Sequence, residues 1–267
     1  MGRRSPPPDG CGLMLNIIVP MAGAGSRFAK AGYVLPKPLI PVHGVPMIRL
    51  VTENVRPARP HRFIYICQRT HVQEFGLRET LKSWSANAEI VEIDGLTEGA
   101  VCTVLCAKSL FGDDNPMMIV NSDQFVDIDI NDYLADMDDR RLDGLIMTMQ
   151  ADDPKWSFAS IDDHGMVTSV VEKQVISNHA TVGIYNFRSG RDFVQHAEAM
   201  IAKNLRINNE FYVAPVYNEL IAAGANIGIY GIGAEADGMY GLGIPDDLNL
   251  FLGLDISHRA TKGLTAA

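Results

Sequence analysis

The stretch that decides the fold is Ile17-Ile18-Val19-Pro20-Met21-Ala22-Gly23-Ala24-Gly25-Ser26-Arg27, and Pro36-Lys37-Pro38 follows it along the chain. Its apolar first part predicts a buried strand that ends in a loop of small residues. The glycines carry no Cβ, so backbone N–H groups of the loop can approach a polyphosphate closely. Arg27 can bind phosphate oxygens through a bidentate fork, and Lys37 can act as a point charge on a segment that two prolines restrict. The pattern favours an anion site formed by Ala22, Gly23, Ala24, Gly25, Ser26, Arg27 and Lys37.

Two well-known phosphate loops do not match this stretch. A dinucleotide fingerprint requires a third glycine where this chain has Phe28. A P-loop requires Gly-Lys-Ser or Gly-Lys-Thr after four intervening residues, and no such triplet follows. A glycine-rich turn between a strand and a helix is the plain structural alternative. Arg27 and the Pro-Lys-Pro segment weigh against it.

The segment from Pro20 to Met47 resembles the beginning of the sugar-phosphate nucleotidylyltransferases. It contains their signature, Gly-x-Gly-x-Arg followed by Pro-Lys, and ends in Pro41-Val42-His43-Gly44-Val45-Pro46-Met47. The resemblance extends over roughly residues 15–250 and looks like the nucleoside-diphosphate-sugar pyrophosphorylase type of capsule and surface-polysaccharide pathways. It implies a magnesium-dependent transferase of nucleotide-sugar biosynthesis.

Strand and helix patterns alternate four times in the first half of the chain, which predicts an α/β fold with a mostly parallel, doubly wound sheet. With the resemblance, the expected architecture is a three-layer, Rossmann-like domain with a mixed sheet. The expected strands are residues 15–20, 62–67, 88–93, 116–120, 144–149, 166–171, 180–187 and 227–232, and the expected helices are 46–55, 75–84, 99–110, 191–202 and 213–223.

Composition indicates one folded domain with short extensions. The 267 residues are 47% hydrophobic, which is enough for a substantial core. We expect a disordered leader at residues 1–13, a single domain at 14–255 and a C-terminal tail at 256–267 that carries little pattern and frays. The net charge of −9 argues against nucleic-acid binding. No apolar run reaches the roughly 18 residues that span a bilayer, so we expect no membrane partner and a cytoplasmic protein.

Asp123 is the expected metal ligand. It follows an apolar strand pattern, where an unpaired carboxylate is costly to desolvate and Mg²⁺ bridging phosphates is a usual partner. A turn or helix-capping aspartate is the alternative for this position taken alone. The resemblance favours the metal, because the similar enzymes carry a metal-binding Asp at this strand end.

Gly241 is a departure from the family pattern. Many of the similar enzymes place a second metal ligand at this position, just before the late Gly-x-Pro turn. Three explanations account for Gly241. Asp123 could hold Mg²⁺ with phosphates and waters alone, a neighbour such as Asp237 could substitute for the missing ligand, or the use of metal could be altered. We favour the first, because Mg²⁺ often keeps several waters.

The resemblance also places the nucleobase and the acceptor. Glu98 and Gly99 would line the base, with Gly99 admitting a base edge to a helix N-terminus. Glu172 would accept sugar hydroxyls and Lys173 would contact the sugar phosphate, although a solvated turn is the plain alternative for this pair. Gly183 would let the sugar approach the backbone.

Three further residues complete the expected acceptor pocket, namely Ser122, Thr181 and Glu210. The segment 208–212 could equally cap the helix that follows it, and the sequence weighs the two interpretations evenly.

The implied reaction transfers a nucleoside monophosphate from an NTP to a phosphorylated acceptor and releases pyrophosphate. The favoured acceptor is a sugar 1-phosphate. Arg27 and Lys37 would hold the triphosphate and the leaving group, and Lys173 would steer the attacking phosphate. A CTP-dependent cytidylyltransferase acting on a small non-sugar acceptor is the nearest alternative. A glycosyltransferase using Asp127-Ile128-Asp129 and a non-catalytic sugar-nucleotide sensor are more distant ones. A homo-oligomer is a further option.

Overall fold

Strand β1 (Leu15–Pro20) lies inside a large sheet, in a computed structural model that describes residues 13–264. It pairs in parallel with β4 (His61–Gln68) on one side and with β6 (Met117–Val120) on the other. Strand β5 (Glu89–Ile93) pairs in parallel with the outer edge of β4. The first half of the chain therefore builds a wholly parallel block, in the order β5-β4-β1-β6.

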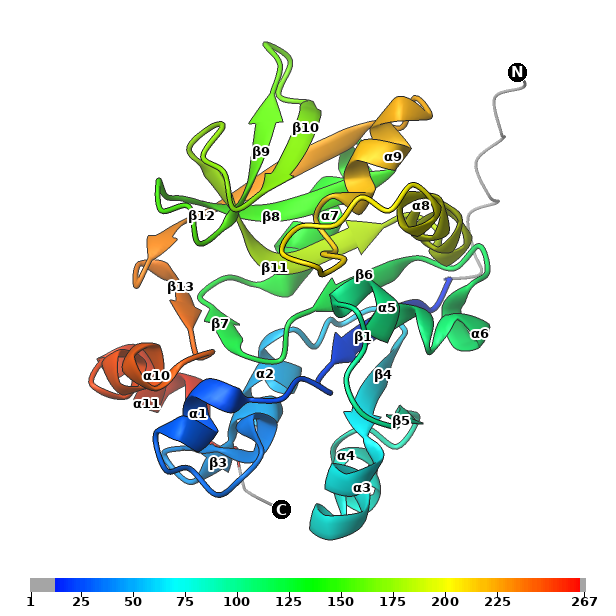
Figure 1. The fold of residues 1–267 in the computed structure, drawn as a ribbon. Coiled ribbons are helices and arrows are strands. Elements are labelled where there is room, and N and C mark those ends of the chain that lie inside the picture. Colours follow the sequence, from blue (N-terminus) through cyan, green and yellow to red (C-terminus); the bar gives the residue numbers. More distant parts are fainter. Residues whose placement is uncertain (1–12, 265–267) are drawn as a thin grey trace.

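The second half extends the sheet beyond β6 and makes it mixed. The order continues through β11 (His179–Phe187), β8 (Gly144–Gln150), β12 (Ile227–Glu235), β13 (Gly238–Gly241) and β7 (Gln124–Val126). Strand β11 is antiparallel to both β6 and β8, whereas β12 is parallel to β8. Strands β9 (Ser157–Ile161) and β10 (Val167–Glu172) form a hairpin that branches from β11 (Figure 1).

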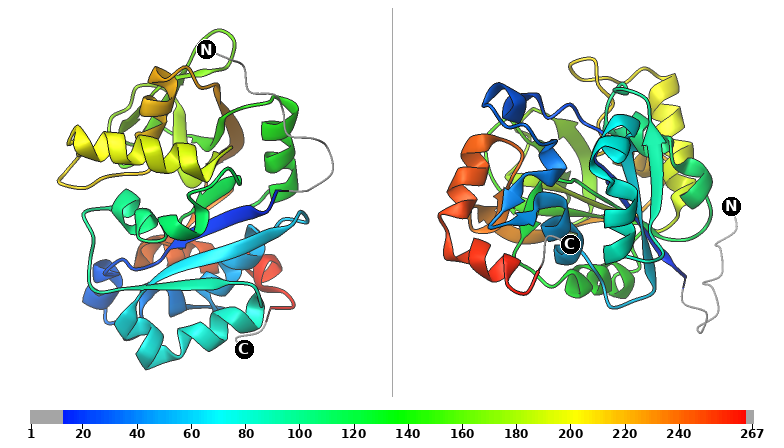
Figure 2. Two further views of the ribbon diagram at one scale, coloured as in Figure 1. Left: turned by 90° about the vertical axis from the view of Figure 1, so that its right-hand side faces the viewer. Right: turned by 90° about the horizontal axis from the view of Figure 1, so that it is seen from below.

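Helices cover both faces of the sheet, as Figure 2 shows, and the predicted three-layer α/β fold is confirmed. One face packs against α2 (Met47–Asn54), α3 (Arg69–Phe75), α4 (Leu77–Trp84) and α7 (Ile130–Asp139). The other packs against α5 (Ala100–Leu105), α6 (Lys108–Phe111), α8 (Gly190–Ala202) and α9 (Val216–Ala222).

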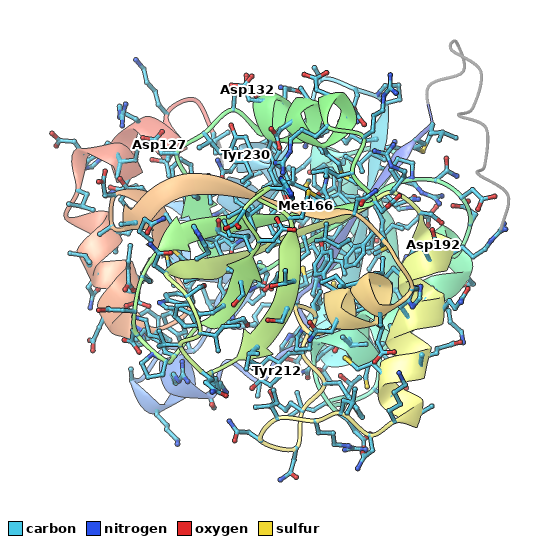
Figure 3. All side chains as sticks on the ribbon, turned by 90° about the horizontal axis from the view of Figure 1, so that it is seen from above. Asp127, Asp132, Met166, Asp192, Tyr212 and Tyr230 are labelled. Carbon is cyan, nitrogen blue, oxygen red and sulfur yellow. The ribbon has the colours of Figure 1, made fainter. Side chains whose placement is uncertain are left out.

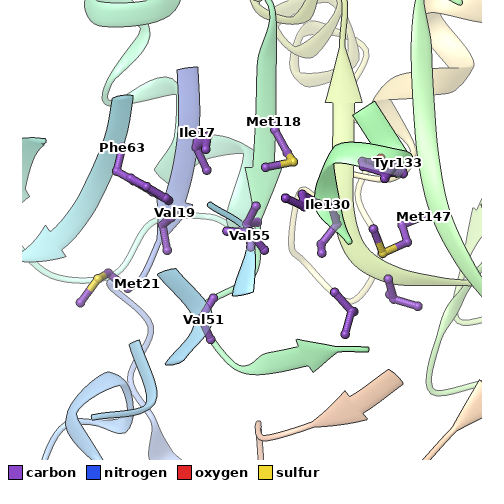
Figure 4. Close-up of a cluster of buried hydrophobic side chains, with 14 of the residues drawn as sticks. Ile17, Val19, Met21, Val51, Val55, Phe63, Met118, Ile130, Tyr133 and Met147 are labelled. Carbon is purple, nitrogen blue, oxygen red and sulfur yellow. The ribbon is translucent and has the colours of Figure 1, made fainter. Parts of the chain in front are cut away.

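The apolar run of β1 serves both layers. Successive side chains of a strand point to opposite faces, so Ile17 and Val19 enter one core while Ile18 enters the other. Figure 4 shows the first core, in which Ile17 and Val19 share a cluster with Val51 and Val55 of α2. This double burial explains why the strand reads as a continuous apolar run rather than an alternating one.

A third, smaller cluster joins the two ends of the chain. It packs residues of α1 (Ser26–Lys30), β2 (Pro41–Val42), α2 and β7 against the C-terminal helices α10 (Pro245–Leu252) and α11 (Asp255–Thr261) (Figure 1). The 3₁₀ turn η1 (Lys37–Leu39) and strand β3 (Val45–Pro46) belong to the same N-terminal segment. The expectation of a patternless, fraying segment after Leu254 is wrong for residues 255–261. They form α11, which buries Ile256 and is tied to the β2–β3 turn by a 2.7 Å hydrogen bond between His43 and Ser257.

Two of the expected helices are broken in the structure. The helix expected at 75–84 starts at Leu77, because Gly76 takes a left-handed conformation with φ 60° and ends α3. The helix expected at 99–110 is divided into α5 and α6.

The disordered leader expected at residues 1–13 lies almost wholly outside the described residues. None of the helices within 13–264 is long and apolar enough to cross a membrane.

Ile17→Ala tests the role of β1 in the core. The Ile17 side chain is fully buried, so its truncation should lower the free energy of unfolding by roughly 2–5 kcal/mol, measured by urea denaturation. Leu205→Ala removes the same number of carbons from a side chain that is 51% exposed and should change stability little. Equal losses in the two variants would contradict the central position of β1.

Candidate functional site

The loop after β1 is shaped by Gly25. This residue has φ 58°, a left-handed conformation that glycine tolerates, and it precedes the first residue of α1. A Cβ built on Gly25 would lie 3.3 Å from the Cβ of Lys37. The glycine therefore lets the 3₁₀ turn that carries Lys37 pack closely on the loop, which brings two parts of the predicted anion site together.

Lys37 and Asp123 form an ion pair at the carboxyl ends of neighbouring strands. The distance from Lys37 Nζ to Asp123 Oδ2 is 2.7 Å, and the two side chains are 20% and 25% exposed. Asp123 follows β6, which runs parallel to β1, so both strands end at the same edge of the sheet. Because the pair is partly buried, water does not fully screen the attraction between its two charges. The carboxylate is thereby held in one place in the site.

A cleft of about 730 Å³ opens at this edge of the sheet. Most of the predicted site residues line it, namely Ala24, Gly25, Ser26, Arg27, Lys37, Asp123, Glu172, Lys173, Thr181, Gly183 and Glu210. Five predicted residues are not among its lining: Ala22, Gly23, Ser122, Glu98 and Gly99. Of these, Ala22 and Ser122 are buried.

Gly99 has a packing role that the sequence did not reveal. Its φ is 124°, and a Cβ there would lie 2.5 Å from the backbone nitrogen of Phe211. The N–H of Phe211 donates to the carbonyl of Glu98 at 2.8 Å, and the N–H of Val101 donates to the carbonyl of Phe211 at 3.1 Å. The Glu98 side chain forms an ion pair with Arg206 instead of facing the cleft. Ala100, the next residue along, is the part of this segment that lines the cleft.

Glu172 is a buried carboxylate on the far side of the cleft. It ends β10 and accepts a hydrogen bond from the hydroxyl of Ser157 on the neighbouring strand β9. Burial raises the pKa of Glu172, and the Ser157 hydrogen bond opposes that shift because it stabilises the charged form. A buried, oriented carboxylate of this kind can accept hydrogen bonds from hydroxyl groups of a ligand.

Lys173 follows Glu172 with its ammonium group held against an aromatic ring. Its Nζ donates a 2.7 Å hydrogen bond to the hydroxyl of Tyr212, and this bond raises the pKa of Lys173. Tyr212 lies on the loop between α8 and α9, labelled in Figure 3. The predicted cation is thus oriented by a loop that is distant in sequence.

The segment 208–212 forms one wall of the cleft. Asn208 and Asn209 have φ values of 50° and 64°, and Ile207 and Glu210 exchange two backbone hydrogen bonds of 3.0 Å around them, which closes a tight turn. Glu210 and Tyr212 then line the cleft. Helix α9 begins only at Val216, without a side-chain cap, so the capping interpretation of this segment is wrong.

Gly183 lies at a close approach between β11 and the loop after β6. Its φ is 83°, and a Cβ there would lie 2.3 Å from Asn121 Nδ2 and 2.6 Å from Gln124 Oε1. The carbonyl of Gly183 accepts the N–H of Asn121 at 2.9 Å. Because Gly183 has no side chain, β11 can pack closely against Asn121 and Gln124 at the bottom of the cleft. The missing side chain also leaves the cleft open at this position.

Several lining residues were missed by the sequence reasoning. Lys155 and Trp156 belong to the turn between β8 and β9, which carries no motif. The indole Nε1 of Trp156 and the amide Nε2 of Gln124 are buried and have no hydrogen-bond partner within residues 13–264, so both remain available as donors. Asp247 in the first turn of α10 also lines the cleft, and burial raises its pKa while Lys155 opposes the shift.

The Asp127-Ile128-Asp129 pair is not part of the cleft. Asp129 caps α7 by accepting the N–H of Asn131, and Asp127 pairs with Arg259 at 3.5 Å. In Figure 3 Asp127 lies well away from Tyr212. The metal pair that a glycosyltransferase would require is therefore absent from the residues that line the cleft.

The surroundings of Asp123 suit a cation. The Lys37 ammonium already stands beside the carboxylate, and a Cβ at Gly243 would lie only 2.7 Å from Asp123 Oδ2, so glycine keeps the space there free. Residues 13–264 contain no cluster of three or more His, Cys, Asp or Glu side chains that could hold a metal alone. A single carboxylate of this kind fits a divalent cation that is held mainly by substrate phosphates and waters.

Residues 16–212 match the model of the nucleotidyl transferase family, and this match covers most of the chain. The chain belongs to the nucleotidyl transferase family. The match includes the loop after β1, Asp123 and the Glu172-Lys173 pair, all of which the structure brings to one cleft.

Two curated relatives have similar sequences. The low-salt glycan biosynthesis nucleotidyltransferase Agl11 of Haloferax volcanii is 26% identical over 170 residues, which are 62% of this chain and 47% of that protein. The mannose-1-phosphate guanyltransferase of Gibberella zeae is 27% identical over 180 residues, 64% of this chain and 49% of that protein. The chain thus spans about half the length of these nucleotidyl transferases.

Two solved structures share the fold. The nucleoside-diphosphate-sugar pyrophosphorylase of Vibrio cholerae has a TM-score of 0.75 and 27% identity, covering 89% of this chain and all 100% of that one. The inositol-1-phosphate CTP transferase of T. maritima has a TM-score of 0.72 at 12% identity, covering 96% and 99% of the two chains, a likeness of fold alone.

Ser157→Ala should raise the pKa of Glu172 further. The serine hydroxyl stabilises the ionised carboxylate, so its loss leaves the burial penalty opposed only by the charge of Lys173, and ionisation requires a higher pH. Carbon-13 NMR titration of the glutamate side-chain carboxyl groups measures the shift. Ser160→Ala makes the same change on the same strand at a residue outside the cleft and should leave Glu172 unaffected. An unchanged Glu172 titration in Ser157→Ala would refute the assigned hydrogen bond.

Proposed function

We propose that this nucleotidyl transferase transfers a nucleoside monophosphate from an NTP to a sugar 1-phosphate and releases pyrophosphate. One observation carries the proposal: the cleft holds cationic groups on two opposite walls, with a carboxylate between them. Arg27 and Lys37 lie on the wall formed by the N-terminal loop, Lys173 lies on the wall formed by the β9–β10 hairpin, and Asp123 lies at the sheet edge. Two phosphorylated substrates can bind such a cleft face to face.

The N-terminal wall is assigned to the triphosphate. Arg27 is exposed and takes part in no ion pair within the described part of the chain, so its guanidinium is free to bind phosphate oxygens bidentately. Lys37 is held beside Asp123 and can shift its ammonium between the carboxylate and a phosphate. Both side chains lie where negative charge would grow on the pyrophosphate leaving group, and such charge stabilisation is the main task in phosphoryl chemistry.

The opposite wall is assigned to the acceptor. Glu172 can accept hydrogen bonds from sugar hydroxyls, and the ring-held ammonium of Lys173 can bind the sugar phosphate. An oxygen of that phosphate then attacks the α-phosphorus of the NTP, and the bond from the α-phosphorus to the pyrophosphate oxygen breaks. Both substrates are positioned by the protein, so no covalent intermediate with the chain is required.

The metal in this proposal is Mg²⁺ bound through Asp123. When bound with the NTP, it would neutralise charge on the α-phosphate and the pyrophosphate oxygens. The names of the curated relatives, a glycan biosynthesis nucleotidyltransferase and a mannose-1-phosphate guanyltransferase, support a role in the supply of sugar nucleotides for a glycan. A capsular glycan is part of the proposal through the sequence resemblance alone.

Pyrophosphate release from a panel of NTPs and acceptors tests the function. Each of the common NTPs is combined with Mg²⁺ and either hexose 1-phosphates or small non-sugar phosphorylated acceptors, and pyrophosphate is measured by a coupled assay. We expect release with at least one sugar 1-phosphate. Release only with CTP and a non-sugar acceptor would replace the proposal by a cytidylyltransferase, and nucleotide binding without any release would replace it by a sensor.

Lys37→Ala should reduce kcat by roughly 10²–10³-fold, because an ammonium group placed at the developing charge is lost. Thermal melting should show that the fold is intact. The matched control is Lys30→Ala, which removes the same group from an exposed position on α1 outside the cleft and should keep wild-type activity. Wild-type turnover in Lys37→Ala would refute the role assigned to this residue.

A further inference from the structure

Within the described residues three lysines line the cleft, and they are held by two kinds of partner. Lys37 and Lys155 are each paired with a carboxylate, at 2.7 and 2.8 Å, which offsets the charge of the ammonium. Lys173 takes part in no ion pair within residues 13–264, and its ammonium donates to the uncharged hydroxyl of Tyr212 at 2.7 Å. We propose that Tyr212 is a positioning residue that holds the Lys173 ammonium, charged and without a counterion, in place for the phosphate of the acceptor. The inference rests on the proposed function, which assigns this wall of the cleft to the acceptor.

The backbone of Lys173 is fixed independently of its side chain. Its φ is 57°, a left-handed conformation that is uncommon for a residue other than glycine and persists only where the surroundings hold it. The N–H of Lys173 donates to the carbonyl of Trp156 at 3.0 Å. A flexible four-carbon stem separates this backbone from the ammonium. The place of the charge therefore depends on what contacts the end of the side chain.

The hydroxyl of Tyr212 holds the ammonium without offsetting its charge. A neutral hydroxyl accepts a hydrogen bond but carries no opposite charge, so the attraction of the ammonium for a phosphate is retained. The carboxylates of Glu172 and Glu210 also line the cleft and act electrostatically on Lys173. An ammonium that Tyr212 no longer holds would be drawn to one of these carboxylates, and that ion pair would compete with the phosphate of the acceptor. The hydroxyl thus keeps the cation available to the substrate.

The loop that carries Tyr212 is anchored outside the cleft. Phe211, the residue before it, is buried and forms two backbone hydrogen bonds, of 2.8 Å to Glu98 and of 3.1 Å from Val101. Arg206 pairs with Glu98 at 3.1 Å, and its guanidinium carbon lies 4.4 Å from the centroid of the Phe211 ring. Neither Arg206 nor Phe211 lines the cleft. The position of the Tyr212 hydroxyl is therefore set by contacts that do not involve a substrate.

Tyr212→Phe tests the inference, because it removes the hydroxyl and keeps the ring. Rates of pyrophosphate release are measured with the NTP and the phosphorylated acceptor that the wild type uses. The KM for the acceptor should rise by about tenfold, since small misplacements of a positioned group have effects of this size, and the KM for the NTP should stay within about twofold. Tyr230→Phe removes the same hydroxyl from β12, outside the cleft lining, and should change neither KM (Figure 3). An unchanged acceptor KM in Tyr212→Phe, or equal rises for both substrates, would overturn the inference.

A double-variant cycle distinguishes a residue that acts through Lys173 from one that contacts the acceptor directly. Lys173→Met removes the ammonium and keeps a long side chain. Adding Tyr212→Phe to Lys173→Met should change kcat/KM for the acceptor by less than about twofold, because the two substitutions remove one shared interaction. A further drop of about tenfold in the double variant, with circular dichroism showing a native fold, would overturn the positioning role.

The outcome for the wild type separates this inference from the proposed function. An active wild type whose acceptor KM is unchanged by Tyr212→Phe refutes the inference alone. A wild type that releases no pyrophosphate with any NTP and acceptor refutes the proposed function, and the inference with it.

Discussion

The parallel pairing of β1 with β6 is the constraint on which the rest of the site depends. Because the two strands run side by side in the same direction, the loop after β1 and Asp123 after β6 emerge at one edge of the sheet. The 2.7 Å contact between Lys37 and Asp123 closes this edge. Both strands are buried on both faces, so their register is held by two cores at once. The positions of these charged groups are therefore set by the apolar packing of the two strands.

The opposite wall of the cleft is built from segments that are far apart in sequence. The β9–β10 hairpin supplies Glu172 and Lys173, and the loop before α9 supplies Tyr212, whose hydroxyl holds the Lys173 ammonium. The glycine at 99 serves this assembly by admitting the backbone of Phe211, which two backbone hydrogen bonds then lock in place. This packing role of Gly99 is not visible in the sequence, where the position is predicted to contact the base. A glycine is required at such a position because only a residue without a side chain lets two backbones come so close.

Sequence reasoning succeeded where a segment forms its structure from its own pattern. The apolar runs of β1 and β6 identified the centre of the sheet, and the residue types of Arg27, Lys37 and Asp123 identified a cationic and an anionic group at its edge. It failed for α11, where Ile256 is buried only because the chain ends pack together in the third cluster. It also failed for Lys155, Trp156 and Asp247, which lie in turns or at a helix start without a motif. Their place in the cleft depends on contacts between remote elements.

The sequence by itself determined the α/β class, the buried first strand and the loop of small residues that follows it, because hydrophobic period and residue chemistry are local properties. Only the tertiary structure decided which acidic residue of α10 lines the cleft. The anchoring of α10 through Leu248 and Phe251 sets its rotation, and this rotation turns Asp247 into the cleft and leaves Asp246 exposed. The rotation of a helix is fixed by what its apolar residues pack against, and for Phe251 these partners include Phe125 of β7, which is remote in sequence, and Tyr240 of β13.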